Sequence, residues 1–265
     1  MNTEQLVSEN SYRYLPRFYD EAGFSEYASV CTPRFMNFLQ ENGWLGRRIL
    51  DLGCGTGVST KVFAEAQKSV TAVDSSAEML ARAEARFQDT GFDIEFVRQS
   101  AQAYKPVGNS YDLVYALDLL NHVTSIRDIE AIFQRANYAL QMEKQFLFDL
   151  QTIRDLAEGI GNRAQILHNS EGLFIVAKNA FHYDTLSLRQ EIDIFNLESE
   201  GLFRRAQEVH ILRGYPFRAV VSMLRRTGFE IEHLIDPVLN TYAETSDLPP
   251  RIVVVLRKMR DLVNQ

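Results

Sequence analysis

The chain has 265 residues, of which 46% are hydrophobic and 24% are charged, a composition typical of a folded globular protein. Its formal net charge of −7 disfavours a dedicated nucleic-acid binder, because such proteins attract phosphate with an excess of basic side chains. Two cysteines are too few for a disulfide scaffold, and we find no secretory leader pattern. The apolar runs are shorter than the roughly 20 residues of a membrane span. We therefore expect a cytoplasmic protein.

Residues 1–47 are predicted to form a helical cap. Aromatic side chains cluster in its first half, among them Tyr12, Tyr19 and Phe24, and an amphipathic stretch follows around residues 35–39. For these aromatic residues, apart from Tyr19, packing on the rest of the fold is favoured over a lid.

From residue 48 to about 152, short apolar runs alternate with helical segments, which is typical of βαβ units on a parallel sheet. The predicted strands are residues 49–52, 70–73, 94–97, 113–117 and 146–148. The helix after the second strand is predicted to begin with Ser75 as its N-cap and Glu78 three residues later, as in a capping box.

Beyond residue 165 the apolar pattern has a period of two instead, which predicts an antiparallel insert with strands at residues 173–178, 185–195 and 202–212. A helix that ends at Gly228 and a closing pair of strands follow. The predicted fold class is α/β: a doubly wound, Rossmann-like, seven-stranded sheet with a helical N-terminal cap and an antiparallel β insert. The predicted domains are the cap (1–47), the core (48–164 and 215–265) and the insert over the active site (165–214).

The segment Ile49–Gly57 contains a buried strand, then three alternating glycines, then the start of a helix. Glycine is needed where the backbone adopts a positive φ or approaches a ligand closely. Such a corner suits a carboxylate or a phosphate. Phosphate is the weaker interpretation, because the dinucleotide fingerprint would require glycine at Val58 or Thr60 and no P-loop lysine follows.

Asp74 ends the second predicted strand about twenty residues beyond the glycine loop. A carboxylate at this place can accept both hydroxyls of a ribose, so the ligand is predicted to be a nucleoside. Helix capping alone explains Asp74 less well, because Ser75 is available for that purpose.

Three segments, Asp51–Gly57, Val73–Leu80 and Tyr111–Val114, resemble the class I methyltransferases that use S-adenosylmethionine. The resemblance covers most of residues 48–150 and implies S-adenosylmethionine as the cofactor. It implies that the glycines cradle the methionine part, that Asp51 anchors its amino group and that Asp74 holds the ribose. The cofactor-binding residues expected on this basis are Tyr19, Asp51, Gly53, Cys54, Gly55, Gly57, Asp74, Ser75, Met79, Ser100, Ala101 and Leu117.

Within that set, Met79 would flank the adenine, while Ser100 or the backbone N–H of Ala101 would bind it. The family usually has an acidic residue at this corner, and the present chain does not.

Further segments are similar to small-molecule methyltransferases that carry an antiparallel insert, including amino-sugar N-methyltransferases. They are Leu117–His122, Phe148–Thr152, Glu208–His210 and Gly228–Phe229. In that group a Tyr-Asp segment near the N-terminus, here Tyr19–Asp20, closes over the cofactor.

Methyl transfer from a sulfonium is an in-line displacement, so catalysis consists mainly of alignment and needs no metal. His122 is the candidate catalytic base, although substrate hydrogen bonding or a structural cap would also explain it. Glu208 and His210 share one strand face and would bind the acceptor if that face points inward; otherwise they belong to an exposed polar face. The remaining histidines and the cysteines lack metal-ligand spacing, so no metal is expected.

The leading hypothesis is therefore an enzyme that methylates a nitrogen or oxygen of a small-molecule metabolite, with no membrane partner. An RNA methyltransferase is disfavoured by the acidic charge balance. A non-catalytic S-adenosylmethionine-binding protein and a nicotinamide oxidoreductase are the competing hypotheses. The acceptor and the oligomeric state are left open.

Overall fold

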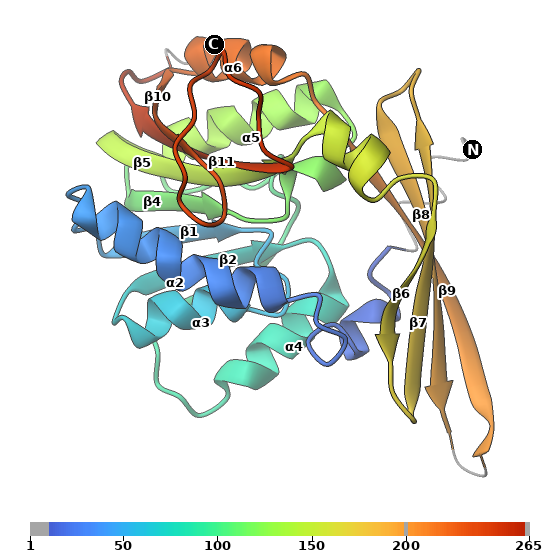
Figure 1. Cartoon of the computed structure of the whole chain (residues 1–265). Coiled ribbons are helices and arrows are strands. Elements are labelled where there is room, and N and C mark those ends of the chain that lie inside the picture. Colours follow the sequence, from blue (N-terminus) through green and yellow to red (C-terminus); the bar gives the residue numbers. More distant parts are fainter. Residues whose placement is uncertain (1–10, 199–200, 263–265) are drawn as a thin grey trace.

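The computed structural model describes residues 11–198 and 201–262, so the first ten residues of the expected cap lie outside the described part. The chain forms a seven-stranded sheet flanked by helices and a separate four-stranded antiparallel sheet beside it (Figure 1). The predicted α/β class is thus confirmed.

The elements of the core are α2 (Glu26–Glu41), β1 (Arg48–Leu52), α3 (Val58–Glu65), β2 (Ser69–Asp74), α4 (Ala77–Phe87), β3 (Ile94–Arg98), β4 (Tyr111–Ala116), α5 (Ile126–Ala139), β5 (Leu140–Gln151), α6 (Phe217–Arg226), β10 (Phe229–Ile235) and β11 (Arg251–Lys258). The insert contains β6 (Ala164–Asn169), β7 (Leu173–His182), β8 (Ser187–Leu197) and β9 (Phe203–Arg213). Short helical turns are η1 (Leu15–Arg17), η2 (Leu120–His122) and η3 (Asp155–Gly159).

The core strands lie in the order β10-β11-β5-β4-β1-β2-β3. Strands β1 to β5 are parallel, whereas β10 and β11 form the antiparallel pair that closes the sheet. The direction of winding reverses between β1 and β4, and open α/β sheets bind ligands at the carboxyl ends of the strands at such a point. The topology therefore places a ligand crevice after β1 and β4.

Helices cover both faces of this sheet. On one face, Phe133 of α5 packs against Phe146 of β5, with ring centroids 6.1 Å apart, and α6 lies beside α5. On the other face, Phe63 of α3 meets Tyr115 of β4 edge to face at 4.9 Å, and Phe35 of α2 is fully buried nearby. These two apolar layers fix the strand ends that carry the site.

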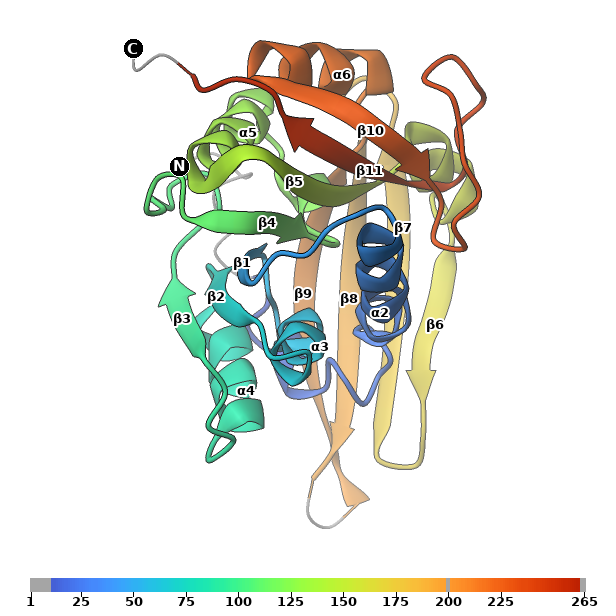
Figure 2. The ribbon, with the colours of Figure 1, turned by 90° about the vertical axis from the view of Figure 1, so that its left-hand side faces the viewer.

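The insert has four strands where the sequence pattern predicts three. Strand β7 alternates buried and less buried side chains along its length, as the period of two requires. Edge strand β6 has no fully buried side chain and packs only Leu167 against the apolar cluster of the insert, so the apolar alternation that marks a strand in a sequence is weak there. Figure 2 shows this sheet standing behind the core, with its strands running across those of the core sheet.

Residues 11–25, here called the N-terminal segment, lie between the core and the insert (Figure 1). Of these residues Leu15–Arg17 are helical, and Leu15 and Ala22 are buried against Ile175 and Ile192 of the insert. The segment therefore joins the two sheets at the carboxyl edge of the core.

The predicted N-cap of α4 is wrong by one residue. Ser76, not Ser75, has the extended cap conformation, and its Oγ accepts a hydrogen bond from the Met79 N–H at 3.2 Å. Asp74 Oδ1 takes the Ser76 N–H at 2.8 Å, so the chain turns into the helix one residue later. Because Met79 then occupies the third helical position, no capping box forms.

Candidate active site

The glycine loop comes directly after β1 in the chain and lies beside the carboxyl end of β2. The N–H groups of Gly53 and Cys54 both donate to the Val73 carbonyl, at 2.8 and 3.1 Å. Gly53 and Gly55 have φ values of +72° and +55°, which a residue with a Cβ adopts only under strain. No atom lies within 4 Å of the place that a Cβ on Gly55 would take, so the backbone there is open to a ligand.

The third glycine of the loop has a different surrounding. Gly57 is the N-cap of α3 with a φ of +79°. A Cβ at this position would lie 3.0 Å from Phe87 and 3.2 Å from Ala83. Gly57 thus allows α4 to pack closely against the loop.

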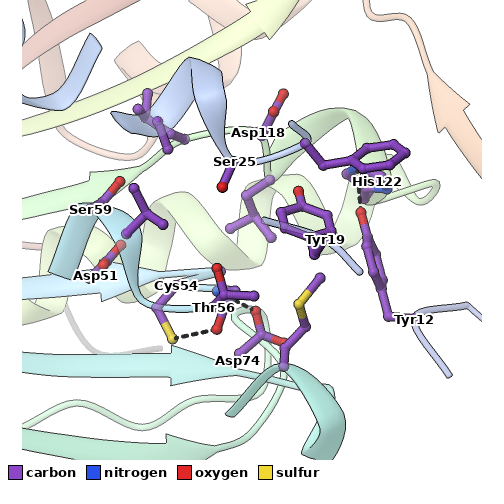
Figure 3. A pocket seen from close by; sticks show the side chains of 18 of the residues that line it. Tyr12, Tyr19, Ser25, Asp51, Cys54, Thr56, Ser59, Asp74, Asp118 and His122 are labelled. Carbon is purple, nitrogen blue, oxygen red and sulfur yellow. Dashed lines mark hydrogen bonds between the residues drawn. The ribbon is translucent and has the colours of Figure 1, made fainter. Parts of the chain in front are cut away.

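A cavity of about 150 Å³ opens at the carboxyl ends of β1, β2 and β4 (Figure 3). Its lining residues are Tyr12, Tyr19, Phe24, Ser25, Ala28, Asp51, Gly53, Cys54, Gly55, Thr56, Val58, Ser59, Asp74, Ser75, Met79, Leu117, Asp118, Leu119 and His122. Three of these described lining residues are carboxylic acids, and none is lysine or arginine. The cavity is therefore suited to a ligand with positive charge.

Asp51, at the end of β1, is 2% exposed. Its Oδ2 accepts a hydrogen bond from the Thr60 hydroxyl at 2.6 Å. Burial raises the pKa of Asp51 to about 7, an effect that the Thr60 bond opposes and the nearby Asp74 increases. A ligand ammonium group beside this carboxylate would stabilise its ionised form.

Asp74, at the end of β2, accepts hydrogen bonds from two backbone N–H groups. Its Oδ2 takes that of Gly55 at 2.9 Å, and its Oδ1 takes that of Ser76 at 2.8 Å. Burial raises the pKa of Asp74, although these hydrogen bonds oppose the shift. An ionised carboxylate has about four acceptor sites, so this one retains capacity for the hydroxyls of a ligand.

The N-terminal segment covers the cavity and is tied to the glycine loop. Tyr12, Tyr19 and Phe24 all line the cavity. Asp20 accepts a hydrogen bond from the Thr56 hydroxyl at 2.8 Å and forms an ion pair with Arg86 at 2.5 Å. The Tyr-Asp pair that was expected near the cofactor therefore lies at the cavity, with Asp20 as its attachment to the core.

His122, in η2, lies on the far side of the cavity from Asp51 (Figure 3). Its Nε2 is 3.2 Å from the hydroxyl of Tyr12. Burial lowers the pKa of His122 to about 4, and the neighbouring His210 adds to this effect. Burial also raises the pKa of Tyr12, so both groups are neutral at pH 7.

Glu208 and His210 of β9 point inward, as one of the two sequence interpretations requires. Their side chains are 0% and 3% exposed, and His210 Nε2 is 2.8 Å from Glu208 Oε2. The ring of Tyr12 lies edge-on to that of His210, with centroids 4.5 Å apart. The insert thus contributes polar groups next to Tyr12 and His122.

Asp118 lies just after the carboxyl end of β4 and is held there by residues of β5 and β11. Its N–H donates to Asp149 at 2.7 Å, and Arg251 binds both Asp118 and Asp149 at 2.5 Å. These contacts hold Asp118 at a φ of +54°, a strained value for a residue other than glycine. Burial raises the pKa of Asp149, and Arg251 counteracts that shift.

The structure brings most of the residues expected from the sequence to this one cavity. These are Tyr19, Asp51, Gly53, Cys54, Gly55, Asp74, Ser75, Met79, Leu117 and His122. Gly57, Ser100 and Ala101 do not line it, and their contact with a cofactor stays a prediction.

Sequence reasoning did not place Tyr12, Thr56, Ser59 or Asp118 in the site. Thr56 and Ser59 could have been found, because they lie in the glycine loop and in the first turn of the helix after it. The place of Tyr12 depends on a contact with a residue 110 positions away, for which the local pattern gives no signal.

The described residues hold no group of three or more histidine, cysteine or acidic side chains that could bind a metal ion. In the same part of the chain, no helix is long and apolar enough to cross a membrane.

Comparisons with known proteins point to one kind of domain. Residues 49–143 match a family model described as a methyltransferase domain. The putative methyltransferase YqeM of Bacillus subtilis (strain 168) is 26% identical over 218 residues, which cover 82% of this chain and 86% of that protein. The matched domain runs from β1 into β5 and includes all three carboxylates of the cavity.

Solved structures share the whole architecture, including the insert. An S-adenosylmethionine-dependent methyltransferase from Clostridium acetobutylicum ATCC 824 has a TM-score of 0.81 at 23% identity, over 95% of this chain and 100% of that one. The sugar N-methyltransferase KedS8 from Streptoalloteichus sp ATCC 53650 has a TM-score of 0.72 at 18% identity, over 92% of each chain. At these identities the likeness establishes the fold.

Proposed function

We propose that this chain is an S-adenosylmethionine-dependent methyltransferase of class I that methylates a nitrogen or oxygen of a small-molecule metabolite. The observation that carries the proposal is the acidic cavity at the carboxyl ends of β1, β2 and β4, with the insert on its far side. The similarity in architecture to a sugar N-methyltransferase supports a small acceptor. The two cysteines, which are both unpaired, fit the expected cytoplasmic location.

The cofactor fits the residues present. S-adenosylmethionine supplies a methyl group on a positively charged sulfur, and the cavity lining offers only negative charge. Asp51 would bind the ammonium group of the methionine part, and Asp74 would accept the ribose hydroxyls. The open side of Gly55 would let the ligand lie against the backbone.

The acceptor is proposed to meet Tyr12 and His122. Because its pKa is about 4, the His122 ring is neutral at pH 7, and in the tautomer that carries its proton on Nδ1 the Nε2 atom accepts a hydrogen bond. The nucleophilic N–H or O–H would donate to Nε2 either directly or through the Tyr12 hydroxyl, which already lies 3.2 Å from it. For a hydroxyl, His122 would accept the proton along the same path as the C–S bond of the cofactor breaks, whereas an amine would react through its lone pair and lose its proton to solvent afterwards.

The charge of the cavity restricts the acceptor. Tyr12 and His122 are both neutral at pH 7, and none of the described lining residues is lysine or arginine. A carboxylate or phosphate next to the reacting atom would therefore be desolvated without a cation to pair with. The reacting end of the acceptor is therefore proposed to be a neutral hydroxyl or an amine.

Two measurements test the proposal. A thermal-shift comparison should show stabilisation by S-adenosylhomocysteine and none by NADH, because a ligand that binds only the folded state raises its melting temperature. Incubation with methyl-labelled cofactor and a panel of amines and alcohols should then label at least one acceptor.

His122→Ala should reduce turnover at least tenfold while leaving S-adenosylhomocysteine affinity within about twofold. Binding of NADH alone, or labelling of RNA rather than any small acceptor, would contradict the proposal. Unchanged turnover in His122→Ala would remove the role of His122 only.

A further inference from the structure

Most of the hydrogen bonds between the N-terminal segment and the insert converge on one buried carboxylate; they add to the apolar packing of Leu15 and Ala22 and to the bond from Ser11 Oγ to the Val209 carbonyl. Glu208 Oε2 accepts the N–H of Tyr12 at 3.1 Å, and Oε1 accepts the N–H groups of Leu15, at 2.9 Å, and of Tyr14. His210 adds a fourth contact at 2.8 Å. These bonds stabilise the ionised form and hold the pKa of Glu208 below its ordinary value, although burial alone would raise it.

A fully buried carboxylate that receives several N–H groups is costly to separate from them. Without these donors the charge would be buried and unpaired, and the three backbone groups would lose their acceptor. The bonds therefore favour one position of the segment strongly. In that position the Tyr12 hydroxyl lies 3.2 Å from His122 and Tyr19 lines the cavity.

The cavity beneath the segment is smaller than a cofactor site needs to be. Its volume is about 150 Å³, whereas pockets for ligands of cofactor size begin at roughly 300 Å³. On the core side the segment is attached through Asp20, whose ion pair with Arg86 is partly exposed, and through the Tyr12 carbonyl, which accepts a bond from Ser76 Oγ at 3.3 Å. The attachment to the insert through Glu208 is the fully buried one.

We propose that Glu208 is a positioning residue: it holds the N-terminal segment closed, sets Tyr12 against His122, and controls the rate at which the cofactor and its product exchange. This inference rests on the proposed function for the identity of the ligand. The proposal assigns the insert a second role. Besides lying next to the acceptor, the insert also determines when the cavity is open.

The first test uses S-adenosylhomocysteine as the probe and surface plasmon resonance as the readout. Glu208→Gln retains one acceptor oxygen but turns an amide NH₂ toward the Tyr12 N–H, and Glu208→Ala removes every bond. Association and dissociation rate constants should both rise, at least threefold in Glu208→Gln and at least tenfold in Glu208→Ala, with the dissociation constant changing less than either. General damage to the site would slow association instead.

Glu191→Gln is the matched control. Glu191 lies on the neighbouring strand β8 but is one-third exposed and pairs with Arg189, so its replacement should leave both rate constants unchanged. Tyr12→Phe should reduce turnover in an otherwise wild-type chain. In a Glu208→Ala chain the same substitution should have little further effect, because Tyr12 is then already displaced.

The second test needs no ligand. Trypsin cleavage after Arg13 and Arg17, both exposed within the segment, requires the segment to leave the insert. Cleavage should be at least tenfold faster in Glu208→Ala than in the wild type and in Glu191→Gln.

If the wild-type chain does not bind S-adenosylhomocysteine, the proposed function fails. The cleavage test then still shows whether Glu208 holds the N-terminal segment closed. If S-adenosylhomocysteine binds but the Glu208 variants change neither its association rate nor the cleavage rate, the role of Glu208 is refuted and the proposed function stands.

Discussion

The pH dependence of cofactor affinity follows from the burial of Asp51. In the free chain its pKa is raised to about 7, chiefly by burial. A bound ammonium group favours the ionised carboxylate, so binding lowers this pKa and releases a proton. Affinity for S-adenosylhomocysteine should therefore increase as the pH rises toward 7 and level off above it.

The size of the effect comes from the fraction of ionised Asp51. With a pKa of about 7, roughly three-quarters of the free chains are ionised at pH 7.5 and only a few per cent at pH 5.5, so the affinity should fall by more than tenfold, or about 2 kcal/mol. The raised pKa of Asp74 acts in the same direction, whereas His122, with a pKa of about 4, stays neutral throughout this range.

Isothermal titration calorimetry between pH 5.5 and 7.5, in two buffers of different ionisation enthalpy, measures both the affinity and the number of protons released. Asp51→Asn keeps an oxygen to accept the Thr60 bond but cannot titrate, so it should bind more weakly with a much smaller pH dependence. Affinity that is constant over this range, or an unchanged slope in Asp51→Asn, would refute the assignment of Asp51 to the ammonium group.

Asp74→Ala should weaken S-adenosylhomocysteine binding by about 1.5–3 kcal/mol, the value of a charge-assisted hydrogen bond, and unchanged calorimetric affinity would contradict the ribose assignment. Gly57→Ala should lower the free energy of unfolding in urea by about 1–2 kcal/mol, because φ is +79° and Phe87 lies 3.0 Å away; an affinity change beyond about threefold would indicate that Gly57 also contacts the ligand. Asn121→Ala should cost about 1–3 kcal/mol of stability, since its buried side chain joins both backbone groups of Gln151 to the carbonyl of Arg213, and stability equal to wild type would show that these bonds contribute nothing.

Strands β1, β2 and β4 could be predicted because each is a buried apolar run with a helix after it. The acidic residues of the cavity could be predicted for a related reason. Asp51 and Asp74 each end such a run, and parallel strands bring their carboxyl ends to the same edge of a sheet. Two acidic residues 23 positions apart in the sequence thus line one cavity.

Two errors have the same physical origin. Strand β6 has no fully buried side chain and is held mainly by its backbone bonds to β7, and backbone bonds leave no trace in the amino-acid pattern. The N-cap of α4 is Ser76 rather than Ser75, because the Asp74 carboxylate accepts a hydrogen bond from the Ser76 N–H. The local rule favours Ser75, because Glu78 lies three residues after it, and the Asp74 hydrogen bond to the Ser76 N–H overrides that preference.

Glu208 shows how far a single residue can be interpreted before the structure is known. Its position in the alternation of β9 places it on the same face as His210 and Leu212, both of which are buried. A carboxylate on such a face must receive hydrogen-bond donors or a cation, because an unpaired buried charge is too costly to persist. Once this face is known to be buried, Glu208 requires donors, but the sequence does not identify them, since they are backbone groups of residues 193 to 196 positions earlier in the chain. Backbone N–H groups are present at every residue except proline, so only the folded path of the N-terminal segment could select these three.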